Sequence, residues 1–294
     1  MRIRLLGTGT PTPSLRRMCS SHLVELGDNV MLFDHGFGGH HRLLEAGIPA
    51  TRVTHMFFTH LHYDHCGDYA RLVLTRWDQG AGQIPDLKVY GPPPLKEMTA
   101  RLFGPQGAFD PDLVARTQHG ASTSIYEARG GKLPRIRPAP VVTELHPGDV
   151  VSEGEWRLKT AMVSHFQPYL LSYGFRLETP HGSFVYSGDS GPVASMYDLA
   201  RDCDVLLHMC HYMTGTNLSE AFAGSCMGHK ELAQVAQEAR VRNLVLTHIT
   251  EQFDLPGMRE RIITEMVAIY KGNLFFGEDL MAIPINGPGP SKLL

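Results

Sequence analysis

The chain lacks several features that would place it in common functional classes. Its five cysteines are odd in number and form no Cys-x-x-Cys pair, which excludes a disulfide framework and a cysteine-based zinc knuckle. Lys and Arg total 27 against 30 Asp and Glu, so the basic excess typical of proteins that grip a phosphate backbone is missing. No apolar run approaches the roughly 18 residues that span a membrane. We expect a cytoplasmic protein with no membrane partner.

Short strand-like runs alternate with amphipathic helices along most of the 294 residues, which predicts an α/β protein. Strands are predicted at 3–6, 22–26, 30–33, 53–59, 156–163, 173–178, 183–186, 205–209 and 244–247, and helices at 42–46, 69–77 and 230–240. Between about 80 and 140, Gly, Pro and short polar stretches are frequent, and we interpret this segment as an insertion. The C-terminal NGPGPSKLL is expected to be a frayed tail.

The strongest chemical signal is the segment HLHYDH, which directly follows the predicted strand 53–59. His60, His62, Asp64 and His65 place four metal-ligand side chains in six residues, with no local charge partner to neutralise them. A divalent cation holds such a set, and Zn²⁺ accepts both imidazole nitrogen and carboxylate oxygen. A single histidine is most often an ordinary surface or core residue, but the four together favour a metal site. Their spacing differs from a helical H-E-x-x-H, so zincin-type protease chemistry is not indicated.

Two further predicted strands also end in ligand-type residues. SFVYSG leads into Asp189, and LVLT leads into His248. Loops at strand ends collect functional groups because the sheet fixes their positions. For Asp189 a helix N-cap or Asx turn is the alternative, and His165 in VSHFQPY has the alternative of an ordinary loop histidine.

Taken in this order, the motifs resemble the metallo-β-lactamase fold, and in particular its RNase Z-like branch of tRNA 3′-processing endonucleases and related phosphodiesterases. The resemblance covers nearly the whole chain, and it rests on LLGTGTP, LFDHG, FFTHLHYDHCGD, VYGPPP, SHFQPYLLSYGFRLE, VYSGDS, CDVLLH, GHKELAQVAQEARV and LVLTHI. It implies a four-layer αββα sandwich with an insertion between the first and third metal motifs. The chain 1–294 would be a single domain of two halves, about 1–79 and 141–285, with the insertion at about 80–140.

The same resemblance implies a hydrolase with two divalent metal ions, for which Zn²⁺ is favoured and Mn²⁺ and Fe are alternatives. One ion would be held by His60, His62 and His165, the other by Asp64, His65 and His248, with Asp189 bridging the two. A bridging hydroxide would be the nucleophile, and Asp64 would orient it and accept its proton.

Several neighbouring residues have less certain roles. His229 resembles a proton donor to the leaving group, but Lys230 and Glu231 follow it where the family has Ser and Thr, so an ordinary helix-start histidine stays open. We expect the remaining candidates to act from outside the ligand set: Asp34 and Thr59 as supports of ligand rings, His208 and His211 in the core or behind the ligands, and His35, His40 and His41 as a solvated face.

The substrate is expected to be a small molecule. RNase Z enzymes usually carry a flexible tRNA-binding arm between the residues that correspond to His165 and Asp189, and here only a hairpin-like pattern fills the segment. With the negative net charge, this disfavours nucleic acid and favours a small phosphodiester or related phospho-ester. The run ARGGKLPRIRP, with Arg129, Lys132, Arg135 and Arg137, either attracts a phosphate or sulfate group or is a solvated loop. We expect the insertion and the Arg16–Arg17 loop to shape the mouth of the pocket.

Four alternatives stay open. The same site suits hydrolysis of a lactone, β-lactam, thioester or aryl sulfate, because a metal-bound hydroxide attacks carbonyl and phosphoryl centres alike. A tRNA 3′-processing endonuclease is the second alternative. A di-iron redox protein would need a flavin partner, and a non-catalytic binding module would be expected to have lost ligands. A homodimer is expected from the resemblance alone.

Overall fold

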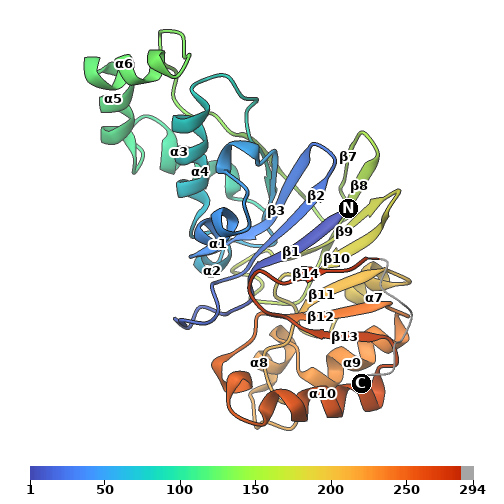
Figure 1. Ribbon diagram of the computed structural model, residues 1–294. Helices are drawn as coiled ribbons and strands as arrows, with labels where there is room; N and C mark the ends of the chain where they lie inside the picture. Colours follow the sequence, from blue (N-terminus) through green and yellow to red (C-terminus); the bar gives the residue numbers. More distant parts are fainter. Residues whose placement is uncertain (286–294) are drawn as a thin grey trace.

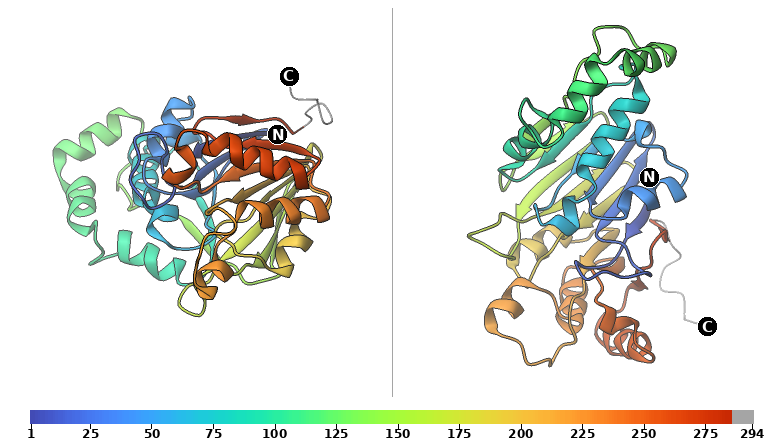
Figure 2. Two further views of the ribbon diagram at one scale, coloured as in Figure 1. Left: turned by 90° about the horizontal axis from the view of Figure 1, so that it is seen from below. Right: turned by 90° about the vertical axis from the view of Figure 1, so that its left-hand side faces the viewer.

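The computed structural model describes residues 1–285, and the expected frayed tail lies outside the described residues. Two seven-stranded sheets face each other, and helices cover the outer face of each sheet (Figures 1 and 2). The predicted four-layer αββα sandwich is therefore confirmed. Among the described residues, no helix is both long and apolar enough to cross a membrane.

The first sheet is built mainly from the N-terminal half of the chain. Its strand order is β14-β1-β2-β3-β4-β5-β6, with antiparallel pairing from β14 to β3 and parallel pairing from β3 to β6. The strands are β1 (Arg2–Gly7), β2 (Ser21–Leu26), β3 (Asn29–His35), β4 (His55–Phe57), β5 (Lys88–Gly91), β6 (Val141–Glu144) and β14 (Ala282–Ile283). The C-terminal β14 thus pairs with the first strand of the chain.

The second sheet is built from the C-terminal half. Its order is β13-β12-β11-β10-β9-β8-β7, antiparallel from β7 to β10 and parallel from β10 to β13. The strands are β7 (Val150–Glu153), β8 (Trp156–Met162), β9 (Tyr173–Thr179), β10 (Gly182–Tyr186), β11 (Val205–Met209), β12 (Asn243–Thr247) and β13 (Asn273–Phe276). Each of the two sheets therefore has a parallel part, whose strands run into the helices of the outer layers.

Helices form the two outer layers. They are α1 (Gly39–Glu45), α2 (Tyr63–Cys66), α3 (Tyr69–Gly80), α4 (Leu95–Phe103), α5 (Asp110–Gln118), α6 (Gly120–Ala128), α7 (Ala194–Ala200), α8 (Glu220–Ser225), α9 (His229–Glu238) and α10 (Met258–Ile269), with short 3₁₀ turns at Ala50–Arg52 and Glu251–Asp254. The apolar faces of α1, α3 and α4 pack on the first sheet, and those of α7, α9 and α10 pack on the second.

Aromatic side chains fill the space between the two sheets. Phe33 and Phe57 of the first sheet stack at 5.1 Å between ring centroids, and both meet Phe175 of the second sheet edge-on at 6.1–6.2 Å. All three are fully buried. Burying a phenylalanine side chain contributes about 1.5–3 kcal/mol, so this layer holds the two halves together and fixes the strand ends that carry the site.

Part of the segment 80–140, which was expected to be an insertion, belongs to the first sheet and its covering helices. β5 and β6 belong to the first sheet and α4 packs on it, whereas α5 and α6 project beyond the far end of α3 (Figure 1). β4 is also shorter than its predicted span of 53–59. The division into one domain with the stated half boundaries stays a prediction.

The basic run of this segment is paired within the protein. Arg135 and Arg129 lie 2.8 and 2.9 Å from the Asp78 carboxylate, and Arg137 pairs with Asp110. The Arg135 guanidinium also lies 3.9 Å from the ring centroid of Trp77, and its side chain is only 3% exposed. The run therefore anchors α5 and α6 to α3, which is a structural use that neither of its two interpretations anticipated.

Candidate metal centre

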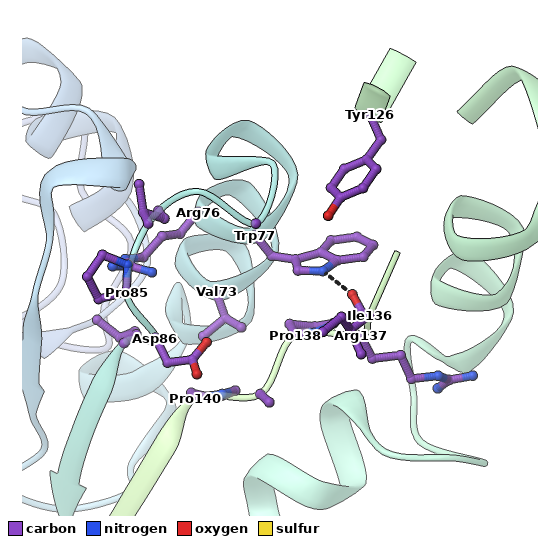
Figure 3. A pocket seen from close by; sticks show the side chains of 14 residues that line it. Val73, Arg76, Trp77, Pro85, Asp86, Tyr126, Ile136, Arg137, Pro138 and Pro140 are labelled. Atoms are coloured by element: carbon purple, nitrogen blue, oxygen red, sulfur yellow. Dashed lines mark hydrogen bonds between the residues drawn. The ribbon is translucent and has the colours of Figure 1, made fainter. Parts of the chain in front are cut away.

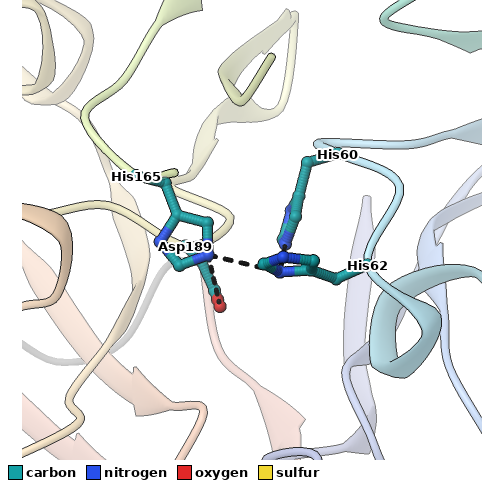
Figure 4. Close-up of side chains that lie close together, drawn as sticks. All are labelled: His60, His62, His165 and Asp189. Carbon is teal, nitrogen blue, oxygen red and sulfur yellow. Dashed lines mark hydrogen bonds and ion pairs between the residues drawn. The ribbon is translucent and has the colours of Figure 1, made fainter. Parts of the chain in front are cut away.

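Loops at the ends of strands from both sheets bring the seven candidate ligands together. The loop after β4 supplies His60 and His62, and the short helix α2 that follows it supplies Asp64 and His65. The β8–β9 loop supplies His165, the turn after β10 supplies Asp189, and His248 directly follows β12. They form two groups: His60, His62, His165 and Asp189 in one, and Asp64, His65 and His248 in the other. Within each group one ligand atom from every residue lies within 4.8 Å of the others, and Figure 4 shows the first group.

Local backbone geometry permits this convergence. Gly188 has a φ of +56°, and a Cβ at this position would lie 2.6 Å from the side chain of Thr59. Only glycine therefore allows the turn that carries Asp189 to approach the loop that carries His60. His248 and Asp34 also have positive φ values, 52° and 55°, and such conformations cluster at functional sites.

The Asp34 carboxylate organises the buried side of the centre. Oδ1 accepts a hydrogen bond from the backbone N–H of Thr59, and Oδ2 accepts one from the Thr59 hydroxyl, each at 2.8 Å. Oδ2 also lies 2.7 Å from Nδ1 of His65 and accepts a bond from the Tyr186 hydroxyl at 2.8 Å. Asp34 and Thr59 thus occupy the expected supporting positions. Tyr186 escapes prediction because a strand tyrosine is an ordinary core residue and only the fold brings it to Asp34.

The rings of the first group are held from their outer sides. Because the Thr59 hydroxyl donates to the carboxylate, its oxygen accepts from Nδ1 of His60 at 3.0 Å. Nδ1 of His165 donates to the Ser225 carbonyl at 2.8 Å. Nε2 of both rings therefore points its lone pair inward, where it lies 3.0 Å (His60) and 3.3 Å (His165) from Nδ1 of His62 (Figure 4). Three imidazole nitrogens converging in this way can share one cation.

Asp189 lies between the two groups. Its carboxylate oxygens are 3.6 Å from Nε2 of His165 in the first group and 3.4 and 3.2 Å from Nε2 of His65 and His248 in the second. Asp64 closes the second group, at 3.4 and 3.3 Å from the same two nitrogens. One carboxylate in contact with both groups is the arrangement expected of a bridging ligand.

Buried charge gives a direct test of whether the centre suits metal ions. Asp34, Asp64 and Asp189 are at most 4% exposed, and none forms an ion pair with Lys or Arg in the part of the chain that the structure describes. Nε2 of His65 and Oδ1 of Asp189 are buried without a hydrogen-bond partner. Buried carboxylates require a positive charge nearby, so this donor set fits divalent cations.

The pKa values of the ligands show the same preference. Burial holds the pKa of His60 well below its ordinary value and also lowers the pKa of His62, so both rings favour the neutral form that ligates metals. Burial alone would raise the pKa of Asp189, but His248 and His65 outweigh it and hold that pKa well below its ordinary value. At His65, burial alone would lower the pKa, but the carboxylates of Asp189 and Asp34 outweigh it and raise that pKa well above its ordinary value. The carboxylates thus favour a positive charge at this position.

His229 lies apart from the ligands, at the start of α9. It is fully buried, its Nδ1 accepts a hydrogen bond from the Thr214 backbone at 3.0 Å, and its Nε2 is 2.9 Å from a carboxylate oxygen of Glu265. Both ring nitrogens are therefore engaged in holding α9, α10 and the loop before α8. The proton-donor role of His229 stays a prediction, and the geometry favours the helix-start alternative.

The other histidines divide between support and core. Nδ1 of His211 lies 3.1 Å from Nδ1 of His248, so His211 stands directly behind a candidate ligand. His208 is fully buried, as expected. The prediction of a solvated face is wrong for His35 and His40, which are 0% and 2% exposed because the turn into α1 folds back over β2 and β3, and only His41 is exposed.

The expected contribution of the insertion to the pocket mouth is wrong for α5 and α6. Arg116 of α5 pairs with Asp78 near the end of α3, and Tyr126 of α6 lies against Arg135, which pairs with the same carboxylate. Nine residues of α3, about 14 Å along the helix, separate Asp78 from Tyr69 at the helix start, which is the end nearer His65 in the sequence. A cavity of about 390 Å³ lies between α3, α6 and the segment 136–140 (Figure 3). None of the candidate ligands lines it. In the Arg16–Arg17 loop, Arg17 is buried and pairs with Asp254, which follows the candidate ligand His248 closely in the sequence.

Comparison with known proteins agrees with this fold. Residues 15–248 match the family model described as the metallo-beta-lactamase superfamily, and the chain belongs to this superfamily. It is a metal-dependent hydrolase of that class. Among curated relatives, the protein named Ribonuclease Z from Mycobacterium sp. (strain KMS) is 30% identical over 98% of this chain and 97% of its own length.

Solved structures show the same fold. YhfI, a metallo-beta-lactamase fold protein from Bacillus subtilis, superposes with a TM-score of 0.73 at 17% identity, covering 96% of this chain and 98% of its own. The short form of human tRNase Z gives a TM-score of 0.68 at 21% identity and covers 97% of this chain and 99% of its own. The family model and the 30% identity to the curated Ribonuclease Z, together with this shared fold, confirm the resemblance to the RNase Z-like branch.

Proposed function

We propose that the protein is a phosphodiesterase that cleaves RNA with two divalent cations. The observation that carries this proposal is the convergence of two adjoining ligand groups on one shared carboxylate, Asp189. Paired cations about 3.5–4 Å apart are typical of phosphoryl-transfer enzymes, because they clamp the attacking and leaving oxygens of the displacement.

Each ligand has a proposed place. One cation would be held by His60, His62 and His165, the other by Asp64, His65 and His248, with Asp189 between them. The mixture of imidazole and carboxylate suits Zn²⁺, with Mn²⁺ and Fe as alternatives. Bound cations would activate water and stabilise charge on a phosphoryl oxygen.

The protein's own side chains would hold and move the proton. The Asp64 carboxylate favours the ionised form: burial raises its pKa, but the adjacent His248 and His65 rings bring that pKa well below normal. An ionised carboxylate at the edge of the ligand set can accept a proton from the attacking water. Asp34 lies behind His65 and would hold the proton of that ring on Nδ1, which leaves the lone pair of Nε2 facing inward.

The relatives favour RNA over the small ester expected from the sequence. The chain matches proteins named Ribonuclease Z over almost their full length, which supports RNA as the substrate. Only the β9–β10 hairpin and its flanking turns lie between His165 and Asp189, so RNA would be held without an arm in this segment. Paired arginines in the insertion favour the second candidate, a small phosphodiester, because they leave few free cations for an RNA backbone. Hydrolysis of a lactone, β-lactam, thioester or aryl sulfate remains a third.

Turnover by metal-replete protein would separate these candidates. The panel comprises a precursor tRNA, an unstructured RNA, bis(p-nitrophenyl) phosphate, a lactone, a cephalosporin and an aryl sulfate, compared by kcat/KM. We expect the highest values for the RNAs. Preference for the chromogenic diester would favour the second candidate, and turnover of the carbonyl or sulfate substrates alone would overturn the phosphodiesterase proposal.

The bridging role of Asp189 has its own test. Asp189→Asn should lose bound metal and turnover together while retaining the fold, because an amide cannot supply the shared negative charge. Asp198→Asn is the matched control, since Asp198 is an exposed carboxylate on α7. Metal content by elemental analysis and folding by circular dichroism are the measurements. Fewer than one metal ion per wild-type chain after reconstitution, or full turnover by Asp189→Asn, would contradict the assignment.

A further inference from the structure

The exposed aromatic side chains of this protein lie in one neighbourhood. Of the 25 Phe, Tyr and Trp residues, all within the described part of the chain, four are classed as exposed. These are Phe37, Tyr63, Phe166 and Tyr169, at 51%, 58%, 47% and 93% exposure, and we call them the aromatic rim. Burial of a large aromatic ring is favourable, so exposed rings confined to one place indicate a binding surface.

The rim flanks the point where solvent reaches the proposed metal centre. Of the seven candidate ligands, His62 is partly exposed and the other six are buried. The Phe166 ring lies 5.3 Å from that of His62 and 4.4 Å from that of His165. Tyr63 directly follows His62, and its ring lies 6.1 Å from that of Phe37. A substrate that reaches His62 therefore meets exposed aromatic rings from both the loop that carries His62 and the loop that carries His165.

Tyr169 extends the surface on the Phe166 side. It lies in the same turn, where its backbone N–H donates to the Phe166 carbonyl at 3.1 Å. Its side chain is almost fully exposed, so packing within residues 1–285 does not explain a large aromatic ring at this position. It contacts none of the candidate ligand rings, which allows its contribution to be measured separately from ligand geometry.

Flat, uncharged rings beside a phosphodiester site recognise a particular chemistry. Aromatic side chains stack on unpaired nucleobases, each stack contributes about 1–3 kcal/mol, and every base offers a face for it. Duplex nucleic acid hides these faces and is gripped through its phosphates by Lys and Arg, which the four rim positions do not provide. Building on the proposed function, we propose that the aromatic rim stacks the nucleobases on either side of the scissile phosphodiester, so that the substrate is an unpaired stretch of RNA.

Binding by single-residue variants tests this. The probe is a fluorescein-labelled decamer of oligoadenylate, measured by anisotropy on metal-replete protein, with an abasic decamer of the same length as the second probe. Phe166→Ala and Tyr169→Ala should each weaken oligoadenylate binding about 5- to 150-fold and leave abasic binding unchanged. Phe166→Tyr and Tyr169→Phe keep the ring and should retain affinity. Ile125→Ala, at an exposed apolar position on α6, is the matched control.

The outcomes separate this proposal from the proposed function. Equal affinity of wild-type protein for the two probes, or unchanged binding by both alanine variants, would overturn the rim as a base-stacking surface. A dimer that dissociates in Tyr169→Ala, seen by analytical ultracentrifugation without any change in oligoadenylate affinity, would show that the rim contacts a second copy instead. Ring-dependent binding without hydrolysis of any phosphodiester would leave the rim standing and overturn the proposed function.

Discussion

Exchanging the Asp34 carboxylate for an amide should weaken metal binding although Asp34 is not a ligand. Four donors converge on this carboxylate, and three of them, including Nδ1 of His65, meet Oδ2. In Asp34→Asn the amide oxygen can keep the Thr59 backbone bond, which turns the NH₂ group toward His65. Two N–H donors would then face each other unless His65 changes tautomer. In the changed tautomer Nε2 carries the proton and cannot bind a metal.

The expected loss of metal affinity can be estimated from other metal sites, in which a residue hydrogen-bonded to a ligand has been replaced. Loss of such a partner costs about 10- to 100-fold in metal affinity, equivalent to about 1.4–2.7 kcal/mol. The backbone contributes little, because Asp34 has a φ of 55° and asparagine tolerates this left-handed conformation as well as aspartate does. The Thr59 and Tyr186 hydroxyls can reverse direction to accept from the amide, so the loss is concentrated on His65.

Competition with a chromogenic chelator measures the dissociation constants of the metal ions at the two proposed sites. We expect one of them to rise 10- to 100-fold, that of the site with Asp64, His65 and His248. Asp68→Asn is the matched control, because Asp68 is a buried carboxylate of the same region that accepts from the His40 backbone. Unchanged affinities in Asp34→Asn, or an equal loss in the control, would refute the argument that this carboxylate sets the His65 tautomer.

Two further predictions concern groups outside the ligand set. His211→Ala should weaken metal binding about 10-fold, because Nδ1 of His248 loses its partner. His211→Gln should restore most of this affinity. Equal affinities of the two variants, measured with the same chelator, would contradict the prediction. Asp78→Asn should lower the free energy of unfolding by about 1–2 kcal/mol at pH 7, because the buried Arg135 exchanges a charged partner for a neutral one. Burial raises the pKa of Asp78, but hydrogen bonds from Arg135 and Arg129 bring it below normal. Its contribution is therefore complete above about pH 4 and disappears as the pH falls through the folded-state value, so urea unfolding should show the variant and wild type converging in acid.

Local patterns account for the part of the site that the sequence predicts best. His60, His62, Asp64 and His65 lie within six residues after a strand-like run, so the strand end and the ligands appear in one window. The remaining ligands are separated from this motif by up to 188 positions, and a single histidine or aspartate carries little signal by itself. Their convergence could be expected only from the resemblance, because the fold brings them together.

Side chains that act through tertiary contacts escaped prediction. His35 and His40 have the composition of a polar surface, but the turn into α1 buries them. Arg135 belongs to a run without acids, and its partner Asp78 comes from α3. Helix α10 (Met258–Ile269) was also not predicted, because partly buried apolar side chains beside Ile262 and Met266 blur the periodicity of its sequence. Arg135 packs on a segment far away in the sequence, and the turn that buries His35 and His40 depends on how the chain folds back on β2, neither of which a windowed pattern includes.

Net charge illustrates how a composition argument changes once a site is known. The value of −3 was counted for the polypeptide alone, and it weighed against nucleic acid as a substrate. Asp34, Asp64 and Asp189 contribute the same charge within the candidate centre. Two divalent cations held there, as proposed, would more than cancel it, and electrostatic arguments about a metal site must include the charge of the ions. The attraction for a phosphodiester would then be concentrated at the scissile group rather than spread along a basic surface. Such a centre needs neutral contacts for the flanking nucleotides, and exposed aromatic rings supply them.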